Sequence, residues 1–200
     1  MAALVVIATM EPAPAEREFT TDWVTSRERL WREHVFKNLP PEPESVHYLE
    51  IGCFEGRNVC FTHDNLTSRR PGSSITCVDP WQWDPNYERR FDANCLHLPD
   101  LTKVKNYSAN FFRSCNPATK WDLIYIDGDH RGRFVLQDSV LAWEFLRSGG
   151  ILVWDDYLLE HPPRHAGEST PREAIDGFML AYRKEIRVLC SAWQMYVQKK

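Results

Sequence analysis

A short turn near residue 50 combines two glycines with a carboxylate. The stretch Glu50-Ile51-Gly52-Cys53-Phe54-Glu55-Gly56 follows an apolar run and precedes a segment of helical periodicity. Because glycine has no Cβ, the backbone at Gly52 and Gly56 can pass close to a ligand, and Glu50 offers a carboxylate at the end of the strand. The pattern predicts a ligand-binding turn, with an ordinary strand-to-helix turn as the alternative.

The spacing of this turn excludes two common nucleotide motifs. It does not satisfy G-x-G-x-x-G, the dinucleotide fingerprint. It also lacks the Lys and the Ser or Thr that follow the last glycine of a phosphate loop. A nicotinamide-dependent oxidoreductase is therefore the least favoured of the functions considered.

A second carboxylate, Asp79, ends the apolar run Ile75–Val78. A carboxylate at that position can accept hydrogen bonds from both hydroxyls of a ribose. Asp79 follows Glu50 by 29 residues, which is longer than the spacing of about 20 in compact nucleotide-binding units, and the loop 65–72 accounts for the excess. Alone, Asp79 is equally consistent with a turn residue before Pro80.

Four further polar residues follow two other apolar runs. Asp127 and His130 come after one run, and Asp155 and Asp156 after the next. Crowded carboxylates repel one another, so we expect raised pKa values, basic partners or a hard cation such as Mg²⁺. A cation at Asp127, Asp155 and Asp156 would lower the pKa of an acceptor hydroxyl, and His130 could take its proton. Turn caps and a solvent-facing histidine are the alternatives.

These residues require alternating strands and helices to position them. Helical periodicity predicts a surface helix over 22–39, ended by prolines, and helices over 57–66 and 134–147, the last stopped by Ser148-Gly149-Gly150. Apolar runs predict strands over 46–51, 74–78, 103–107, 122–126 and 151–154. Continuous apolar strands between helices are typical of a parallel sheet covered on both faces.

The tail of the chain differs from this pattern. Thr170 is expected to cap a helix over 171–182, and two strands follow over 186–190 and 193–197. The short Ser191-Ala192 connection between them permits only an antiparallel hairpin. The segments 81–99 and 158–169 follow no pattern and are expected to be loops that shape a substrate pocket. We divide the chain into an N-terminal arm and helix, 1–44, and one domain, 45–200.

The amino-acid composition favours some classes of binding partner over others. With 24 basic and 28 acidic side chains the formal charge is −4, which disfavours nucleic acid and anionic lipid. No segment has membrane length, and the apolar Met1–Met10 lacks the basic region of a secretory signal, although a cleaved signal remains an alternative. Six scattered cysteines indicate reduced thiols in a cytoplasmic protein. A small molecule is the expected partner, with homodimerisation left open.

Taken together, the motifs resemble a known enzyme family. Glu50-x-Gly52-x-x-x-Gly56, Asp79, Asp127-Gly-x-His130 and Gly149-Gly150-Ile-Leu-Val-Trp-Asp155-Asp156 are similar to those of class I S-adenosylmethionine-dependent methyltransferases, in particular the O-methyltransferase-like methyltransferase-24 family. The likeness covers most of the chain. Asp129 departs from it, because a small residue is expected at that position.

The resemblance implies a fold, a cofactor and residue roles. The fold would be an α/β Rossmann-like three-layer sandwich whose seven-stranded, mostly parallel sheet has its last strand antiparallel. S-adenosylmethionine would be bound by Glu50, Gly52, Gly56, Asp79, Ser108 and Asp127. Asp127 and His130 would be catalytic, with Mg²⁺ held by Asp127, Asp155 and Asp156. The expected reaction is methyl transfer to a hydroxyl of a small-molecule acceptor, and a catalytically inactive cofactor-binding scaffold is the alternative.

Overall fold

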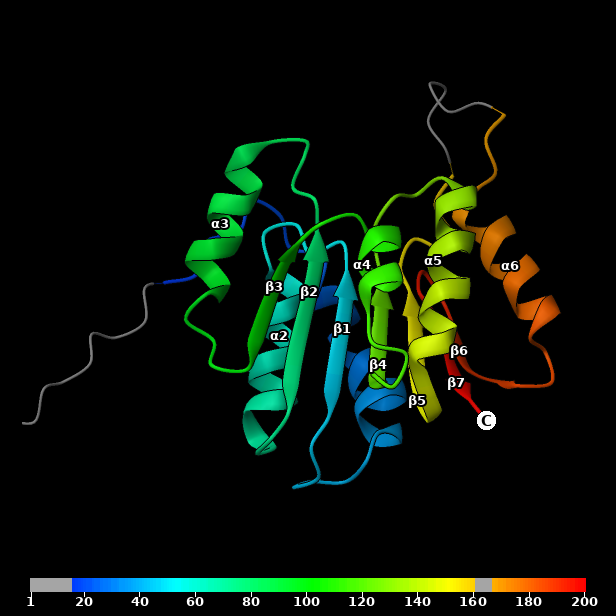
Figure 1. Ribbon diagram of the computed structural model, residues 1–200, viewed down its shortest axis with the longest axis horizontal. Helices are drawn as coiled ribbons and strands as arrows, with labels where there is room; N and C mark the ends of the chain where they lie inside the picture. The colour runs from blue at the N-terminus through cyan, green and yellow to red at the C-terminus, as the bar shows by residue number, and fades with distance from the viewer. Residues whose placement is uncertain (1–15, 161–166) are drawn as a thin grey trace, which may run out of the picture.

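The computed structural model describes residues 16–160 and 167–200 and contains one seven-stranded sheet (Figure 1). The strand order is β3-β2-β1-β4-β5-β7-β6. β1 to β5 pair in parallel, whereas β7 is antiparallel to both β5 and β6. The predicted fold class is therefore confirmed. The strands are β1 (His47–Ile51), β2 (Ser74–Asp79), β3 (Leu101–Lys105), β4 (Trp121–Ile126), β5 (Leu146–Trp154), β6 (Ile186–Ser191) and β7 (Met195–Lys199).

Helices cover both faces of the sheet, as Figure 1 shows. Successive strand residues point to opposite faces, so Leu123 and Tyr125 of β4 enter one apolar core while Ile124 and Ile126 enter the other. The first core packs against α2 (Arg57–Asn65), α3 (Pro85–Cys95) and the N-terminal segment. The second packs against α4 (Ser108–Ser114), α5 (Gly132–Phe145) and α6 (Pro171–Ala181).

The N-terminal segment, residues 16–38, lies across the first face and is called the strap below. The helix predicted over 22–39 is observed as an uninterrupted helical run made of four consecutive short segments: Thr25–Arg27, Glu28–Leu30, Trp31–Val35 and Phe36–Asn38. Its predicted position on the surface is wrong. Trp31 and Val35 are fully buried, and the Trp31 indole N–H donates to Gln194 Oε1 at 3.0 Å. The strap is therefore part of the core.

The structure corrects three boundaries. The segment 81–99 contains α3, which begins at Pro85 behind the N-cap Asp84 and was expected to be loop. β3 begins at Leu101 rather than at residue 103, because Leu101 pairs with Ile75 of β2. The predicted stop at Ser148-Gly149-Gly150 lies inside β5, where the pairing with β4 shifts register.

The tail follows the prediction closely. Thr170 caps α6 in a reciprocal capping box with Glu173, and β6 and β7 form the expected antiparallel hairpin. Within residues 16–160 and 167–200, no helix has the length and apolar character needed to cross a bilayer.

Candidate functional site

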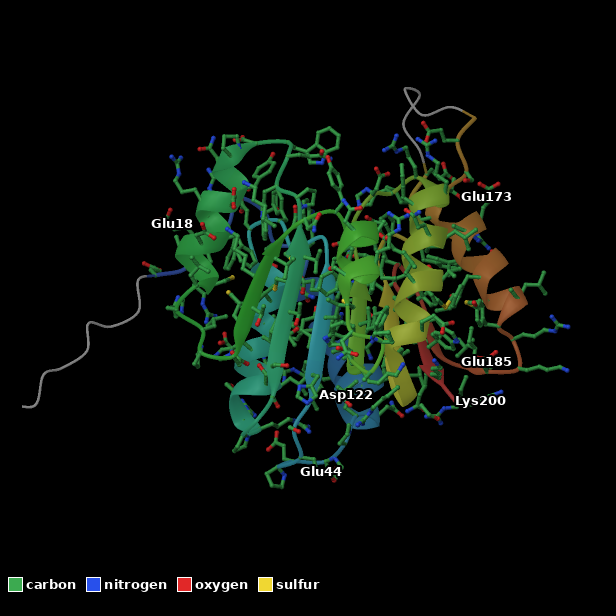
Figure 2. The ribbon with its side chains drawn as sticks, viewed as in Figure 1. Glu18, Glu44, Asp122, Glu173, Glu185 and Lys200 are labelled. Atoms are coloured by element: carbon green, nitrogen blue, oxygen red, sulfur yellow. The ribbon has the colours of Figure 1, made fainter. Side chains whose placement is uncertain are left out.

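The loops that follow β1, β2, β4 and β5 meet at one rim of the sheet. Backbone hydrogen bonds join Gly52 N to Val78 O at 2.9 Å, Asp127 N to Ile51 O at 2.8 Å and Asp155 N to Ile126 O at 3.0 Å. The rim is the carboxyl edge of the parallel strands, where ligands bind in open α/β sheets. Figure 2 shows Asp122, a buried carboxylate at the start of β4, at the opposite edge of the sheet.

The two glycines of the predicted turn serve different contacts. Gly52 has a φ of +84°, and a Cβ there would lie 1.9 Å from the carbonyl oxygen of Asp127. Gly56 precedes α2 with a φ of +81°, and its Cβ would lie 2.2 Å from Cys95 Sγ in α3. Gly52 thus lets the loops after β1 and β4 touch, whereas Gly56 admits α3.

Asp79 connects the ends of β1 and β2. Its Oδ2 accepts hydrogen bonds from Cys53 N at 2.9 Å and Phe54 N at 3.1 Å, and its Oδ1 accepts one from Trp81 N at 2.6 Å. Burial raises the pKa of Asp79, and these backbone donors oppose the rise. Since each carboxylate oxygen has two lone pairs, Asp79 shapes the glycine turn and retains acceptor capacity for a ligand.

Glu50 is a buried carboxyl group, 1% exposed, at the floor of the rim. It accepts hydrogen bonds from the Tyr48 hydroxyl and from Asn58 Nδ2, the latter at 3.0 Å. Burial raises the pKa of Glu50 to about 8. The group is therefore largely protonated at neutral pH and would ionise when a cation approaches.

Ser108 begins α4 and lies farther along the rim. Its hydroxyl donates to Asp138 Oδ1 of α5 at 2.6 Å. Asp138 is 4% exposed, and burial raises its pKa to about 6. Asp138 was not predicted from the sequence, because a carboxylate within an amphipathic helix gives no positional signal.

The acidic residues after β4 and β5 separate into two groups. His130 Nε2 lies 3.1 Å from Asp156 Oδ2 and 3.5 Å from Asp127 Oδ1. One potential ligand atom from each of these three residues lies within 4.8 Å of the others. Asp155 instead pairs with Arg27 of the strap and accepts a hydrogen bond from the Tyr125 hydroxyl. Of the three predicted metal ligands, Asp127 and Asp156 come together with His130, while Asp155 faces a guanidinium.

Basic partners and raised pKa values compensate for the acidic crowding. Arg27 and His130 are basic partners, and burial raises the pKa of both Asp127 and Asp156. The hydrogen bond to Asp127 raises the pKa of His130, so its imidazole is protonated at neutral pH. Asp129, the departure from the family pattern, pairs with Arg131 at 2.5 Å.

A cavity opens between the strap and the rim. Glu50, Gly52 and Asp127 line it, together with residues that were not predicted from the sequence: Arg27, Arg57, Asn58, Tyr125 and Gln194. Those residues lie in the strap, inside α2, within β4 or near the C-terminus, and nothing in their local sequence shows that they converge.

Comparison with known proteins identifies the family. A family model described as a methyltransferase domain, Methyltransf_24, matches residues 49–157, more than half of the 200-residue chain. A protein of Acanthamoeba polyphaga mimivirus is 27% identical over 132 residues, covering 62% of this chain and 58% of that protein. The chain thus spans less than two thirds of that relative's length.

Solved structures share the fold at low sequence identity. The O-methyltransferase TomG from Streptomyces achromogenes, in complex with SAM, has a TM-score of 0.61 at 14% identity, covering 86% of this chain and 80% of its own. An O-methyltransferase from Bacillus cereus, in complex with SAH, has a TM-score of 0.58 at 15% identity, covering 86% of this chain and 90% of its own. The family match includes both the glycine turn and the acidic residues after β5. The chain therefore belongs to the methyltransferase-24 family of methyltransferase domains.

Proposed function

We propose that the chain uses S-adenosylmethionine to methylate a hydroxyl group of a small-molecule acceptor. The observation that carries this proposal is the meeting of Gly52, Asp79 and Asp127 at one rim, on a methyltransferase fold. The O-methyltransferases with the same fold, solved with SAM or SAH, support the choice of cofactor and of acceptor oxygen.

The residues at the rim fit this cofactor. Gly52 has no side chain where the loops approach, and Asp79 keeps one lone pair, on Oδ1, for a ribose hydroxyl. Glu50 and Asp127 bring acidic groups to the cavity, which suits a ligand carrying a sulfonium and an ammonium. Ser108 is assigned to the adenine end. When bound, S-adenosylmethionine supplies an electrophilic methyl group.

We assign the proton transfer to His130. Its side chain is 48% exposed, so the imidazolium can release its proton to solvent and then accept one from an acceptor hydroxyl at Nε2. Asp127 and Asp156 hold the ring in place and stabilise the imidazolium that results. The chain orients the acceptor oxygen towards the methyl donor, and orientation of this kind contributes much of an enzyme's rate.

The same cluster has the donors of a divalent-metal site. The oxygens of Asp127 and Asp156 and the imidazole nitrogen of His130 suit a cation such as Mg²⁺ or Mn²⁺. With such a cation bound, this imidazole nitrogen would be a ligand and not the base, and the cation would instead lower the pKa of an acceptor hydroxyl. Asp155 is a weaker candidate ligand, because Arg27 already neutralises its charge.

Calorimetry with S-adenosylhomocysteine tests the cofactor assignment. We expect micromolar binding to the wild type and at least tenfold weaker binding to Asp79→Ala. Asp64→Ala, which removes a half-exposed carboxylate paired with Arg17, is the matched control and should bind normally. Absence of binding to wild-type protein would overturn the proposal, and binding of NAD in its place would favour an oxidoreductase.

Turnover separates an enzyme from an inactive scaffold. A panel of phenolic and sugar hydroxyl acceptors is incubated with S-adenosylmethionine, with either Mg²⁺ or EDTA. His130→Ala should lose methyl transfer while still binding S-adenosylhomocysteine, whereas Asp127→Ala should lose methyl transfer and also bind S-adenosylhomocysteine more weakly, because Asp127 lines the cavity. Loss of activity in EDTA would assign the cluster to a metal, and equal rates for wild type and both variants would favour the scaffold.

A further inference from the structure

The cavity beneath the strap is lined by both acidic and basic groups. Glu50, Asp127 and Asp155 supply its acidic groups, and Arg27 and Arg57 are the basic residues among those that line it. The acidic residues come from strand ends, whereas Arg27 comes from the strap and Arg57 from the first turn of α2. A ligand with one charge could satisfy only one kind of group, so the lining suits a zwitterion.

The two arginines are not equivalent. Arg27 pairs with Asp155, whose side chain is 4% exposed, and its own side chain is 17% exposed. Arg57 makes longer contacts, with Asp22 Oδ2 at 3.3 Å and Thr25 Oγ1 at 3.2 Å, both through Nη2. A guanidinium has five N–H donors, so Arg57 retains the capacity to bind a carboxylate in the cavity.

The position of Arg57 also favours an anion. It is the first residue of α2, a nine-residue helix with no acidic residue in its first turn. The N-terminus of a helix carries partial positive charge and unpaired N–H groups, which favour a carboxylate. The next residue, Asn58, donates a hydrogen bond to Glu50. The first turn of α2 therefore carries the basic Arg57 beside a residue that holds the acidic Glu50.

We propose that Arg57 binds the carboxylate of the cofactor's amino-acid end, while Glu50 and Asp127 face its ammonium group. This assignment rests on the proposed use of S-adenosylmethionine. It also links the cofactor to the strap, since Arg57 contacts Asp22 and Thr25. Arg27 is assigned to Asp155 and not to the ligand.

A comparison of the affinities of two ligands tests the assignment of Arg57 to the carboxylate. Calorimetry compares S-adenosylhomocysteine with its decarboxylated analogue, which keeps the amine and lacks the carboxylate. We expect Arg57→Gln to weaken the first by about tenfold, as loss of a charge-assisted hydrogen bond does, and to leave the second within twofold. Arg17→Gln is the matched control, because Arg17 is 26% exposed against 25% for Arg57 and also pairs with one aspartate, Asp64.

The outcomes distinguish this inference from the proposed function. If Arg57→Gln weakens both ligands equally, or neither, the carboxylate assignment is wrong while cofactor binding stands. If wild-type protein binds neither ligand, both proposals fall. Arg57→Lys, which keeps the charge and loses the forked geometry, should bind S-adenosylhomocysteine with intermediate affinity, and circular dichroism melting verifies that each variant is folded.

Discussion

Gly52 shows how one residue can serve both the fold and the site. Its φ of +84° places the turn against the loop after β4, where a Cβ would clash with the Asp127 carbonyl oxygen. The glycine is therefore required by contact between two loops before any ligand is considered. Because the same contact sets the backbone of Asp127, a change at Gly52 also displaces the acidic cluster.

Substitution of Gly52 by alanine should destabilise the protein strongly. Gly149→Ala is the matched control, because Gly149 has a similar φ of +78° with nothing within 4 Å of the added Cβ. We expect Gly149→Ala to lower the free energy of unfolding by about 1 kcal/mol through backbone strain alone. Gly52→Ala adds a steric clash and should lower it by about 3 kcal/mol or more. Urea denaturation measures both, and equal losses would show that the loop contact is unimportant.

Asp138 gives a pH-dependent prediction. Its pKa rises from 3.8 to about 6 on burial, so the ionised form is disfavoured in the fold. Stability contributed by the protonated group is present below pH 3.8 and is lost as the pH rises to about 6. Asp138→Asn does not ionise and keeps an acceptor for Ser108. It should match the wild type at low pH and exceed it by up to about 3 kcal/mol above pH 6.

Chemical unfolding at several pH values between 4 and 8 checks this prediction. Asp176→Asn supplies the control, because it makes the same replacement of a carboxyl group by an amide at a half-exposed position. A constant difference between Asp138→Asn and wild type at every pH would contradict the raised pKa.

At the residue scale, the site residues that could be predicted from the sequence are those at the ends of strands. Glu50, Asp79, Asp127 and Asp156 follow apolar runs, and parallel strands bring such positions to one rim whatever the details of packing. The positions of Arg57 and Arg27 at the cavity could not be predicted, because they depend on how α2 and the strap pack. The pairing of Asp155 with Arg27 joins residues 128 positions apart, and no local pattern encodes it.

At the element scale, apolar content decided which segments were predictable. The central strands β1 and β4 are buried along almost their whole length, and they were placed to within one residue. Only the buried part of β5, 151–154, was predicted, and the strand begins five residues earlier, at Leu146. β3 lies at the edge of the sheet and is only partly buried, so its boundary was wrong. α3 was missed because its sequence is largely polar, although Asp84 and Pro85 form a recognisable helix start.

The cap of α3 can be tested directly. Asp84 Oδ1 accepts a hydrogen bond from Asn86 N at 2.8 Å. Asp84→Ala removes this acceptor and should lower the free energy of unfolding by about 1 kcal/mol, whereas Asp84→Asn keeps the acceptor and should lose only a few tenths. Thermal denaturation of the three proteins measures the difference. Equal losses for both variants would assign the effect to the charge and not to the cap.

At the scale of the whole molecule, the strap joins parts that the sheet alone does not connect. It bonds α2 through Arg57, the C-terminal hairpin through Gln194, and the acidic cluster through Arg27. It also forms the roof of the cavity. The sequence of the strap predicted a surface helix. Its buried residues could not be recognised, because they contact residues far along the chain. Its course therefore depends on tertiary packing, and a buried residue outside the strap should anchor it.

Glu55 is that anchor, and its removal should release the start of the strap. Its side chain is 1% exposed and accepts hydrogen bonds from Thr20 N at 2.7 Å, Thr20 Oγ1 at 2.8 Å and Arg90 at 3.0 Å. Glu55→Ala leaves these donors unpaired, so the Thr20 amide should exchange its hydrogen at least tenfold faster in NMR. The Val24 amide, held locally by Asp22 at 3.0 Å, is the control within the strap. Unchanged exchange at Thr20 would show that the apolar contacts of Trp31 and Val35 hold the strap without Glu55.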